Sequence, residues 1–359
     1  MKIFPGLLMI LFLSACVDQP EDPGTHKTTT DIIEYYGNTQ GTTFSVIIND
    51  DIELKQEEIE AMLAQFDQAL SGYIPNSIIS KLNNAPAGLF SYQDEFGYFN
   101  ACYELSKEMY QLTNGAFDPT VYPLVDGWGF MQDIENVPDS SAIDSLRALV
   151  GFKKGQHFDF KYTIDEGDTL PASQIYKRTP QAKLDFNAIA QGYAVDVLAE
   201  MIEEKGAENY FVEIGGEIRV KGKNAEGDYW RIGIDKPIEH STAETRQLQE
   251  VVRLNNKSIA TSGSYRKFYE KDGIKYSHTL DPTTGYPVTH SLLSATVVAD
   301  DCAIADALAT ALMVMGPDKG MQFIKNHSDL DVEVYLIFNN DKGRMETFYT
   351  KDFRDMLIE

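Results

Sequence analysis

A carboxylate and a hydroxyl stand four residues apart in an apolar stretch of the C-terminal part of the chain. Residues 305–313 read Ala-Asp-Ala-Leu-Ala-Thr-Ala-Leu-Met, and a helix would place Asp306 and Thr310 on one face. A carboxylate in such surroundings is costly to bury without a partner. Because Asp and Thr offer hard oxygen ligands, the pair is a candidate site for magnesium or calcium. The alternative is structural, with Asp306 bonded to backbone donors at the helix start and Thr310 to a backbone carbonyl.

A histidine that could act as a general base precedes a turn. Residues 277–287 read Ser-His-Thr-Leu-Asp-Pro-Thr-Thr-Gly-Tyr-Pro, and the chain has six histidines in all. An imidazole at the end of a strand, beside a turn with Pro and Gly, is well placed to accept a proton. The alternative for His278 is a structural imidazole whose hydrogen bonds are satisfied.

Two further segments could hold phosphate groups. Residues 258–264 read Ser-Ile-Ala-Thr-Ser-Gly-Ser, and a tight turn at Ser262 and Gly263 would expose backbone donors. Residues 185–193 read Asp-Phe-Asn-Ala-Ile-Ala-Gln-Gly-Tyr and open a predicted helix, whose free N–H groups and dipole favour anions. Each pattern alone also fits an ordinary turn or helix cap.

Loops with glycine and aromatic residues could wall a flat ring or simply pack. They are residues 116–120, Ala-Phe-Asp-Pro-Thr, and residues 127–130, Gly-Trp-Gly-Phe. Residues 211–217 end a predicted strand with Gly215 and Gly216, where glycine permits the close approach of a ligand or of another backbone.

Hydrophobic periodicity predicts the elements that must position these groups. Helices are predicted at 54–70, 77–83, 96–113 and 303–315, and residues 185–205 begin as a turn and continue as a helix. Strands are predicted at 42–48, 210–222, 229–235, 251–260, 275–280, 293–299, 332–338 and 345–349. Residues 71–76 form a turn, and residues 136–178 are predicted to be an insertion of loops. Helices mixed with strands of antiparallel type, without a strand-helix-strand rhythm, predict the α+β class.

The first residues have the features of a bacterial lipoprotein signal. Lys2 precedes a mainly apolar stretch, and residues 13–16, Leu-Ser-Ala-Cys, resemble a lipobox, in which the Cys becomes the lipid-modified N-terminus. We therefore expect a signal peptide at 1–15, a flexible tether at 16–31 beginning with lipidated (palmitoylated) Cys16, and the folded domain at 32–359. This places the protein in the bacterial cell envelope, lipid-anchored on the extracytoplasmic (periplasmic) side of a membrane. An ordinary secretory signal is the alternative.

Composition limits the partners of the chain. A hydrophobic content of 43% is sufficient for a sizeable core, and a net charge of −24 argues against nucleic acid as a partner. Because its net charge is negative, a protein of this composition that binds a diphosphate needs a cation or backbone N–H donors at the binding site. Cys102 and Cys302 both lie in predicted helices, and their pairing in an oxidising envelope stays open.

Taken in order, these segments resemble the FAD:protein FMN transferases of the ApbE family. The similar stretches span about residues 38–316, and the most specific are 277–287 and 305–311. The resemblance implies one two-lobed α+β domain, related to the T-fold, with FAD in the cleft between the lobes. It also implies a magnesium ion (Mg²⁺) held by Asp306, Thr310 and the carbonyl of Ala188.

The resemblance assigns roles to residues around the cleft. The flavin would lie near Tyr73 and the loop Ala116, Phe117 and Asp118, and His278 would take the proton of the acceptor hydroxyl. The other positions implied for FAD binding are Ile74, Pro75, Asp185, Gln191, Ser262, Gly263 and Leu280. The chain departs from the family pattern at Gln191, where the family usually has Lys, and at Gln40, where it often has Met. The first departure removes a cation near the diphosphate.

The activity implied is magnesium-dependent transfer of FMN from FAD to a Thr or Ser hydroxyl of an acceptor protein, with release of AMP. The family's usual acceptors are flavoprotein subunits of membrane redox complexes. One alternative is an FAD pyrophosphatase, in which water is the acceptor and the products are FMN and AMP. Another is a non-catalytic FAD-binding lipoprotein. Tyr73, as an aromatic platform that keeps FAD bound, favours the transferase, and the intact Asp306, Thr310 and His278 argue against the binding protein.

Overall fold

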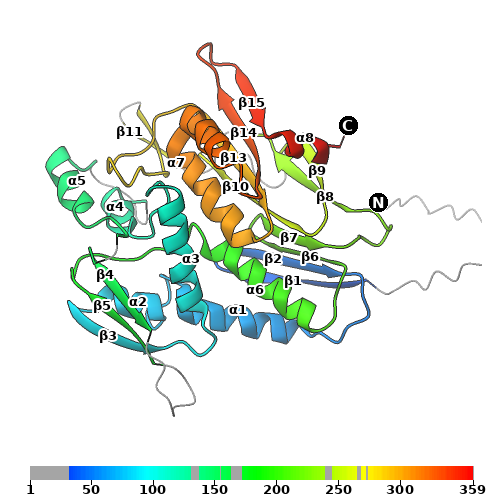
Figure 1. Cartoon of the computed structure of the whole chain (residues 1–359), viewed down its shortest axis with the longest axis horizontal. Helices are drawn as coiled ribbons and strands as arrows, with labels where there is room; N and C mark the ends of the chain where they lie inside the picture. Colours follow the sequence, from blue (N-terminus) through cyan, green and yellow to red (C-terminus); the bar gives the residue numbers. More distant parts are fainter. Residues whose placement is uncertain are drawn as a thin grey trace, which may run out of the picture. The chain divides into compact units, whose positions relative to one another are not determined.

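An antiparallel sheet is the largest sheet in the described part of the chain (Figure 1). The computed structural model describes residues 32–130, 137–153, 155–162, 172–238, 245–264, 268–271 and 274–358. Within these ranges, eight strands pair into one antiparallel sheet, in the spatial order β1 (Ile33–Thr39), β2 (Thr42–Ile48), β6 (Tyr210–Ile214), β7 (Glu217–Lys221), β10 (Lys257–Gly263), β13 (Leu292–Ala299), β14 (Glu333–Asn339) and β15 (Met345–Tyr349).

The main sheet has a hydrophobic core on each face. Because successive strand residues point to opposite faces, Val334 and Leu336 join the larger core, whereas Tyr335 and Ile337 join a second one. The larger core lies against the long helices α1 (Gln56–Leu70), α3 (Tyr98–Leu112), α6 (Ala190–Glu204) and α7 (Cys302–Asn326). The second core lies against the hairpin of β8 (Trp230–Asp235) and β9 (Leu248–Leu254) and the short helix α8 (Lys351–Met356).

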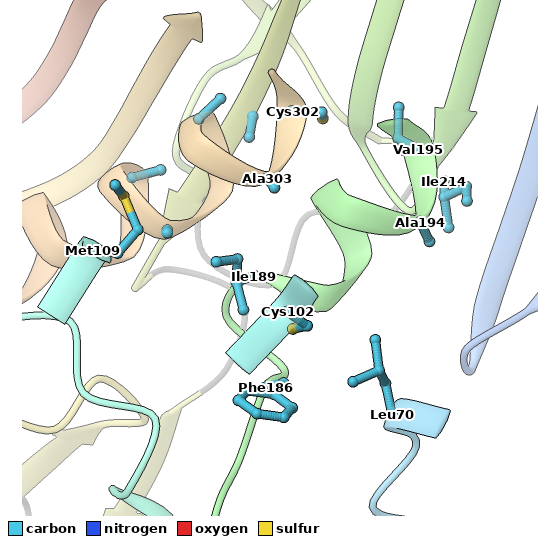
Figure 2. Packing of buried hydrophobic residues seen from close by; sticks show 14 of the residues in the cluster. Leu70, Cys102, Met109, Phe186, Ile189, Ala194, Val195, Ile214, Cys302 and Ala303 are labelled. Carbon is cyan, nitrogen blue, oxygen red and sulfur yellow. The ribbon is translucent and has the colours of Figure 1, made fainter. Parts of the chain in front are cut away.

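Small and medium-sized side chains allow α3, α6 and α7 to pack closely in the larger core (Figure 2). Cys102 comes from α3, Ala194 from α6, and Cys302 and Ala303 from α7, and all four are buried. Both cysteines are free, so the disulfide that the sequence left open is absent. Burial raises the pKa of both thiols, which makes them poor nucleophiles.

Helix α7 bends sharply at Gly316, which has a φ of 79° inside the helix. Pro317 follows and has no N–H, so it cannot bond to the carbonyl of Met313 four residues earlier. The His290 ring replaces that donor, with its Nε2 2.8 Å from the Met313 carbonyl oxygen. The predicted end of this helix at Met315 therefore coincides with the bend, beyond which the helix resumes.

A second lobe is built mainly from residues 77–177 and contains a small antiparallel sheet of β3 (Gly88–Gln93), β5 (Ala172–Lys177) and β4 (Phe158–Tyr162), in that spatial order. Helices α2 (Ile78–Asn84), α4 (Tyr122–Gly127) and α5 (Ser140–Arg147) belong to the same stretch. The hairpin of β11 (Phe268–Lys271) and β12 (Ile274–Ser277) leads into the segment of His278. Helices together with antiparallel strands confirm the predicted α+β class.

Three predicted elements were wrong in detail. The strand predicted at 210–222 is a hairpin, because Gly215 and Gly216, with φ of 60° and 107°, turn the chain between β6 and β7. The strand predicted at 251–260 is divided between β9 and β10 by a turn in which Asn256 has a φ of 51°. The stretch 136–178, predicted to be loops, forms α5, β4 and β5 where it is described.

The predicted signal segment (1–15) and the tether (16–31) with Cys16 lie outside the described residues. None of the helices in the described part of the chain is long and apolar enough to cross a membrane.

Candidate active site

A cavity of about 740 Å³ gathers most of the predicted site residues. Its lining residues include Tyr73, members of the segment 116–130, and residues of β10 and α7. The predicted residues that line it are Tyr73, Ala116, Phe117, Asp118, Asp185, Ala188, Ser262, Gly263, His278, Leu280, Asp306 and Thr310. Ile74, Pro75 and Gln191, although described, are not among the lining residues.

The Asp306 carboxylate lies in the wall of this cavity and is only 5% exposed. Its Oδ2 accepts one long hydrogen bond, 3.2 Å from the backbone N–H of Gly192 at the start of α6. Burial, and to a lesser degree the nearby Asp196 carboxylate, raises the pKa of Asp306. One turn later, the Thr310 hydroxyl lies 3.2 Å from the hydroxyl of Ser262 on β10. This corner therefore presents a poorly compensated carboxylate beside two hydroxyls.

The donor set of this corner fits a hard divalent cation. Within the described ranges, no group of three or more His, Cys, Asp and Glu side chains could hold a metal, so the protein would supply one carboxylate and neutral oxygens. Magnesium is commonly bound by one or two carboxylates, with substrate phosphates and water completing its octahedron. Asp306, Thr310 and the Ala188 carbonyl, which all border the cavity, meet that description.

Gly192 allows α6 and α7 to meet at this corner. A Cβ atom at this position would lie 2.4 Å from the Cys302 carbonyl oxygen and 2.9 Å from the Asp306 Cβ. Only glycine fits such an approach without a shift of backbone. The close contact brings the Gly192 N–H within hydrogen-bonding distance of Asp306.

Asp185 lies in an irregular segment that precedes the helix, which agrees with the turn predicted at the start of residues 185–205. Helix α6 begins at Ala190, whereas the Asp185 carboxylate accepts a hydrogen bond from the Asn187 N–H at 2.8 Å. The Asp185 N–H donates to the Pro119 carbonyl at 2.6 Å, which joins this segment to the loop 116–120. Burial raises the pKa of the Asp185 carboxyl.

The loop 116–120 is fixed by its own side chains. Oδ1 of Asp118 accepts hydrogen bonds from the Thr120 N–H at 2.8 Å and from the Thr120 hydroxyl at 2.5 Å. The hydroxyl oxygen of Thr120 in turn accepts from the Gly151 N–H at 2.7 Å. Burial raises the pKa of Asp118 to about 6. These contacts hold the backbone of Ala116 and Phe117 against the cavity.

Tyr73 reaches the cavity from an exposed turn and is 70% exposed. Two serines of the following segment hold the turn, since the Ser77 hydroxyl donates to the Ser71 carbonyl at 2.7 Å and the Ser80 hydroxyl to the Gly72 carbonyl at 3.3 Å. A rigid turn with an open aromatic face is suited to stacking on a flat ring.

Helix α2 ties this turn to the segment of Asp185. The amide of Asn83, which is 8% exposed, donates to the Leu184 carbonyl at 2.8 Å, and its oxygen accepts from the Leu184 N–H at 2.7 Å. Tyr73 and Asp185, which both line the cavity, are therefore held by one connected framework.

His278 lies between the β11–β12 hairpin and a closed turn. Leu280 pairs with Pro287 in an isolated β-bridge, and the Trp128 indole N–H donates to the Gly285 carbonyl at 2.8 Å. His278 is partly exposed and lines the cavity. The turn thus fixes the backbone next to the histidine at the wall of the cavity.

One expectation about the phosphate-binding positions needs correction. Ser262 and Gly263 were predicted in a tight turn, but they end strand β10 and pair with β13. The Gln191 amide donates to the Ile214 carbonyl at 3.0 Å, and its implied role in FAD binding stays a prediction.

Some lining residues were missed by the sequence analysis. Met313 and Val314 line the cavity and follow Asp306 by seven and eight positions, which is the helical repeat of one face. That spacing could have identified them. Glu217 and Thr261 also line the cavity, but a sequence of strands gives no comparable signal for the direction of their side chains.

The chain is similar to known proteins in sequence and in fold. A model of the ApbE family matches residues 40–336. The chain is 34% identical to the FAD:protein FMN transferase of Vibrio cholerae over 98% of both chains. It is 36% identical to the FAD:protein FMN transferase of Haemophilus influenzae, over 95% of this chain and 94% of that relative. The chain therefore belongs to the ApbE family, which confirms the resemblance inferred from the order of its motifs.

Solved structures share the fold. The flavin transferase ApbE of Vibrio cholerae superimposes with a TM-score of 0.76 at 33% identity, covering 91% of this chain and 99% of that one. The flavinyl transferase ApbE of Pseudomonas stutzeri, in its apo form, gives 0.75 at 32% identity, covering 91% of this chain and 96% of that one. The predicted ApbE-like architecture is therefore confirmed.

Proposed function

We propose that this chain is an FAD:protein FMN transferase, which moves FMN from FAD to a Thr or Ser hydroxyl of an acceptor protein and releases AMP. The observation that carries the proposal is the meeting of two kinds of group in one cavity. A set of oxygen donors for a cation, centred on the buried Asp306, lines the same cavity as His278. A volume of about 740 Å³ is in the range of cofactor-binding clefts.

The reaction requires one bond to form and one to break. The acceptor oxygen attacks the phosphorus on the FMN side of the diphosphate, and AMP leaves with the bridging oxygen. His278 takes the proton of the acceptor hydroxyl, a role that suits a partly exposed imidazole in the cavity wall. Asp306, Thr310 and the Ala188 carbonyl would hold Mg²⁺, which would supply stabilisation of the negative charge on the diphosphate.

The flavin end of FAD would be placed by Tyr73 and the loop 116–120, which also line the cavity. Tyr73 offers an exposed ring for stacking, and the loop with Ala116 and Phe117 is held rigid through Asp118. FAD that stays bound while an acceptor approaches favours transfer to protein over transfer to water. The alternative remains an FAD pyrophosphatase, in which water enters the same site.

The proposal also covers where the enzyme is located and which acceptor proteins it modifies. A lipid anchor at Cys16 would hold the enzyme at the extracytoplasmic side of a bacterial membrane, and the pattern Leu-Ser-Ala-Cys supports it. Flavoprotein subunits of membrane redox complexes, which the resemblance implies as acceptors, would then lie within reach. Incorporation of labelled palmitate into the wild-type chain but not into Cys16→Ala tests the anchor.

The deciding experiment combines the protein with FAD, Mg²⁺ and an acceptor domain that carries an exposed Thr. Release of AMP is followed by chromatography, and the acceptor is weighed by mass spectrometry for an added FMN. We expect AMP release to depend on the acceptor and to be lost with a Thr→Val acceptor or with EDTA. Steady production of AMP and free FMN without an acceptor would indicate the pyrophosphatase. Binding of FAD without AMP under every condition would indicate a binding protein.

A further inference from the structure

Helix α7, which carries Asp306 and Thr310, begins without a cap from its own N-cap residue. Asp301 holds the N-cap position with an extended backbone, yet its side chain makes no capping hydrogen bond. Its carboxylate lies 3.6 Å from the Arg219 guanidinium instead. Asp is a preferred N-cap residue, so the local sequence predicts a cap that the fold does not use.

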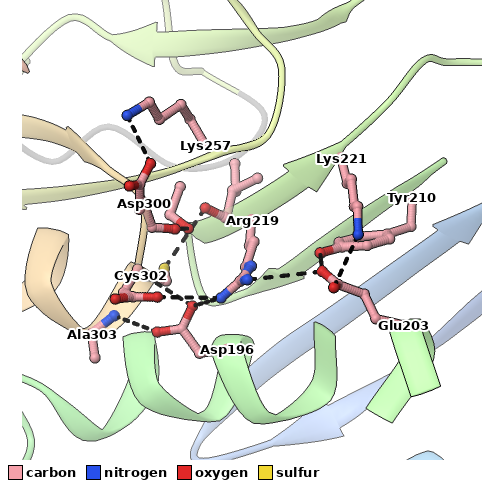
Figure 3. A network of polar contacts seen from close by, with 12 residues as sticks. Asp196, Glu203, Tyr210, Arg219, Lys221, Lys257, Asp300, Cys302 and Ala303 are labelled. Carbon is pink, nitrogen blue, oxygen red and sulfur yellow. Dashed lines mark hydrogen bonds and ion pairs between the residues drawn. The ribbon is translucent and has the colours of Figure 1, made fainter. Parts of the chain in front are cut away.

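The cap comes from helix α6 (Figure 3). The Asp196 carboxylate accepts the Cys302 N–H on Oδ1 at 2.9 Å and the Ala303 N–H on Oδ2 at 2.8 Å. The side chain is only 7% exposed, and both of its oxygens are engaged by the first turn of α7. A carboxylate at this place also favours the positive end of the helix dipole.

Two contacts one turn apart therefore join α6 and α7. Asp196 follows Gly192 by four residues on α6, and Asp306 follows Cys302 by four residues on α7. In the first contact Asp196 binds the N–H of Cys302, and in the second the N–H of Gly192 binds Asp306. Because residues four apart lie on one face of a helix, the two contacts set both the spacing and the rotation of α7 against α6.

The packing of α7 against α6 determines the distance between the proposed cation ligands. The Ala188 carbonyl lies just before α6, and the Asp306 carboxylate lies on α7, so the two donors come from different elements. Their separation is fixed only as well as the helices are held together. Oxygen ligands of Mg²⁺ tolerate little deviation from distances of about 2.1 Å.

Arg219 on β7 allows the cap to remain charged. Its guanidinium lies 2.8 Å from Oδ1 of Asp196 and 3.8 Å from the Glu203 carboxylate, as Figure 3 shows. Burial raises the pKa of Asp196 to about 6, while the capped N–H groups and Arg219 oppose that rise. At neutral pH the cap is therefore an anion with its own counter-ion.

We propose that Asp196 is a positioning residue for the cation site, which by capping α7 from α6 holds the Asp306 carboxylate at the distance from the Ala188 carbonyl that a divalent cation requires. The inference rests on the proposed function only in placing a cation at Asp306. It assigns to Asp196 no contact with FAD or with the acceptor.

The test measures the affinity for a cation directly. Mn²⁺ is titrated into the wild-type protein, Asp196→Asn and the control Asp301→Asn, with and without FAD, and free Mn²⁺ is followed by its electron paramagnetic resonance. Asn presents an NH₂ group to one of the two N–H donors, so the cap is half lost. We expect the dissociation constant to rise about 10–100-fold in Asp196→Asn, as for other residues that orient metal ligands. Asp301→Asn should bind Mn²⁺ like the wild type.

Turnover separates a positioning role from a general loss of structure. At saturating Mg²⁺, Asp196→Asn should regain most of the wild-type rate, because the ligands themselves are intact. If the variant does not fold, as judged by circular dichroism, Asp196→Glu keeps the charge and displaces the cap, and it should weaken Mn²⁺ binding in the same direction.

Two results would overturn the inference. One is an Mn²⁺ affinity of a folded Asp196 variant within twofold of the wild type. The other is a wild-type protein that binds no Mn²⁺ with or without FAD. A wild type that binds Mn²⁺, is weakened by Asp196→Asn and yet transfers no FMN would refute the proposed function while supporting the positioning role.

Discussion

Two carboxylates line the same cavity at nearly the same burial, yet their surroundings differ. Asp306 on α7 is 5% exposed and Asp118 on the loop 116–120 is 7% exposed. Burial raises the pKa of both. Asp118 accepts two short hydrogen bonds from Thr120 on one oxygen, whereas the Asp306 carboxylate accepts one bond of 3.2 Å from Gly192.

The difference supports the proposed roles, a structural carboxylate at Asp118 and a cation ligand at Asp306. Thr120 supplies two hydrogen-bond donors to Asp118 within two residues of chain, so this loop is closed on itself. A buried carboxylate with one weak donor is costly, and Asp306 therefore calls for a further partner from the cavity. Burial and a raised pKa are common to both residues, and only the hydrogen-bond partners distinguish them.

The largest expected effect is the loss of activity when the proposed cation ligand Asp306 is removed. Asp306→Asn should lower magnesium-dependent AMP release by about 10³-fold or more, since a metal supplies several kcal/mol of charge stabilisation to such a reaction. The same variant should lose Mn²⁺ binding, whereas Asp118→Asn should keep it. Rates come from chromatography of AMP, and the affinities come from Mn²⁺ titration.

The comparison would fail if both variants bound Mn²⁺ equally. Circular dichroism of each variant controls for loss of the fold. Equal loss of binding in both would mean that Asp118 is also a ligand.

Substitution of His278 tests whether FAD binding and FMN transfer depend on different residues of the cavity. His278→Ala should retain FAD binding, measured by flavin fluorescence, and lose about 100-fold to 1,000-fold in FMN transfer, because a general base is absent. A rate that rises with pH in the variant, as hydroxide replaces the base, would support the role. Transfer at the wild-type rate would exclude His278 as the base.

The sequence predicted the ligand side better than the framework around it. The four-residue spacing of Asp306 and Thr310 correctly placed both residues on one helix, α7, because helical geometry alone puts them on one face, and both line the cavity. Their role as cation ligands stays a prediction. The cap from Asp196 could not be predicted, since it joins residues 106 positions apart. The close approach at Gly192 is likewise a property of the packed helices.

For the fold, periodicity located the long helices but missed turns inside apolar runs. The β-branched pattern continues on both sides of Gly215 and Gly216, so one strand was predicted where the positive φ values make a hairpin. The pair at residues 255–256, Asn-Asn, carried a turn signal that the strand pattern outweighed.

A smaller effect concerns the pH dependence of stability at Asp118. Its pKa rises from 3.8 in a free carboxyl to about 6 in the fold, so the folded state binds more protons than the unfolded state between these values. The free energy of unfolding should therefore fall as pH rises from 4 to 6, by up to about 3 kcal/mol from this group. The Asn side chain of Asp118→Asn does not titrate, so this contribution to the fall in the free energy of unfolding is absent in the variant. Urea unfolding at pH 4 and pH 7 should show the variant gaining on the wild type at the higher pH, and an unchanged difference would refute the assignment.

The smallest effect is a difference in the free energy of unfolding between two glycine substitutions, one where α6 meets α7 and one in the Tyr73 turn. Gly192→Ala places a methyl group 2.4 Å from the Cys302 carbonyl oxygen and should lower the free energy of unfolding by about 1–3 kcal/mol, as overpacking does elsewhere. In the Tyr73 turn, a Cβ at Gly72 would meet nothing within 4 Å, so Gly72→Ala should change the free energy by less than about 0.5 kcal/mol. Urea unfolding of both variants gives the two values. Equal values would mean that the α6–α7 crossing can relax as freely as an exposed turn, and a crossing that relaxes so freely could not hold Asp306 in a fixed place.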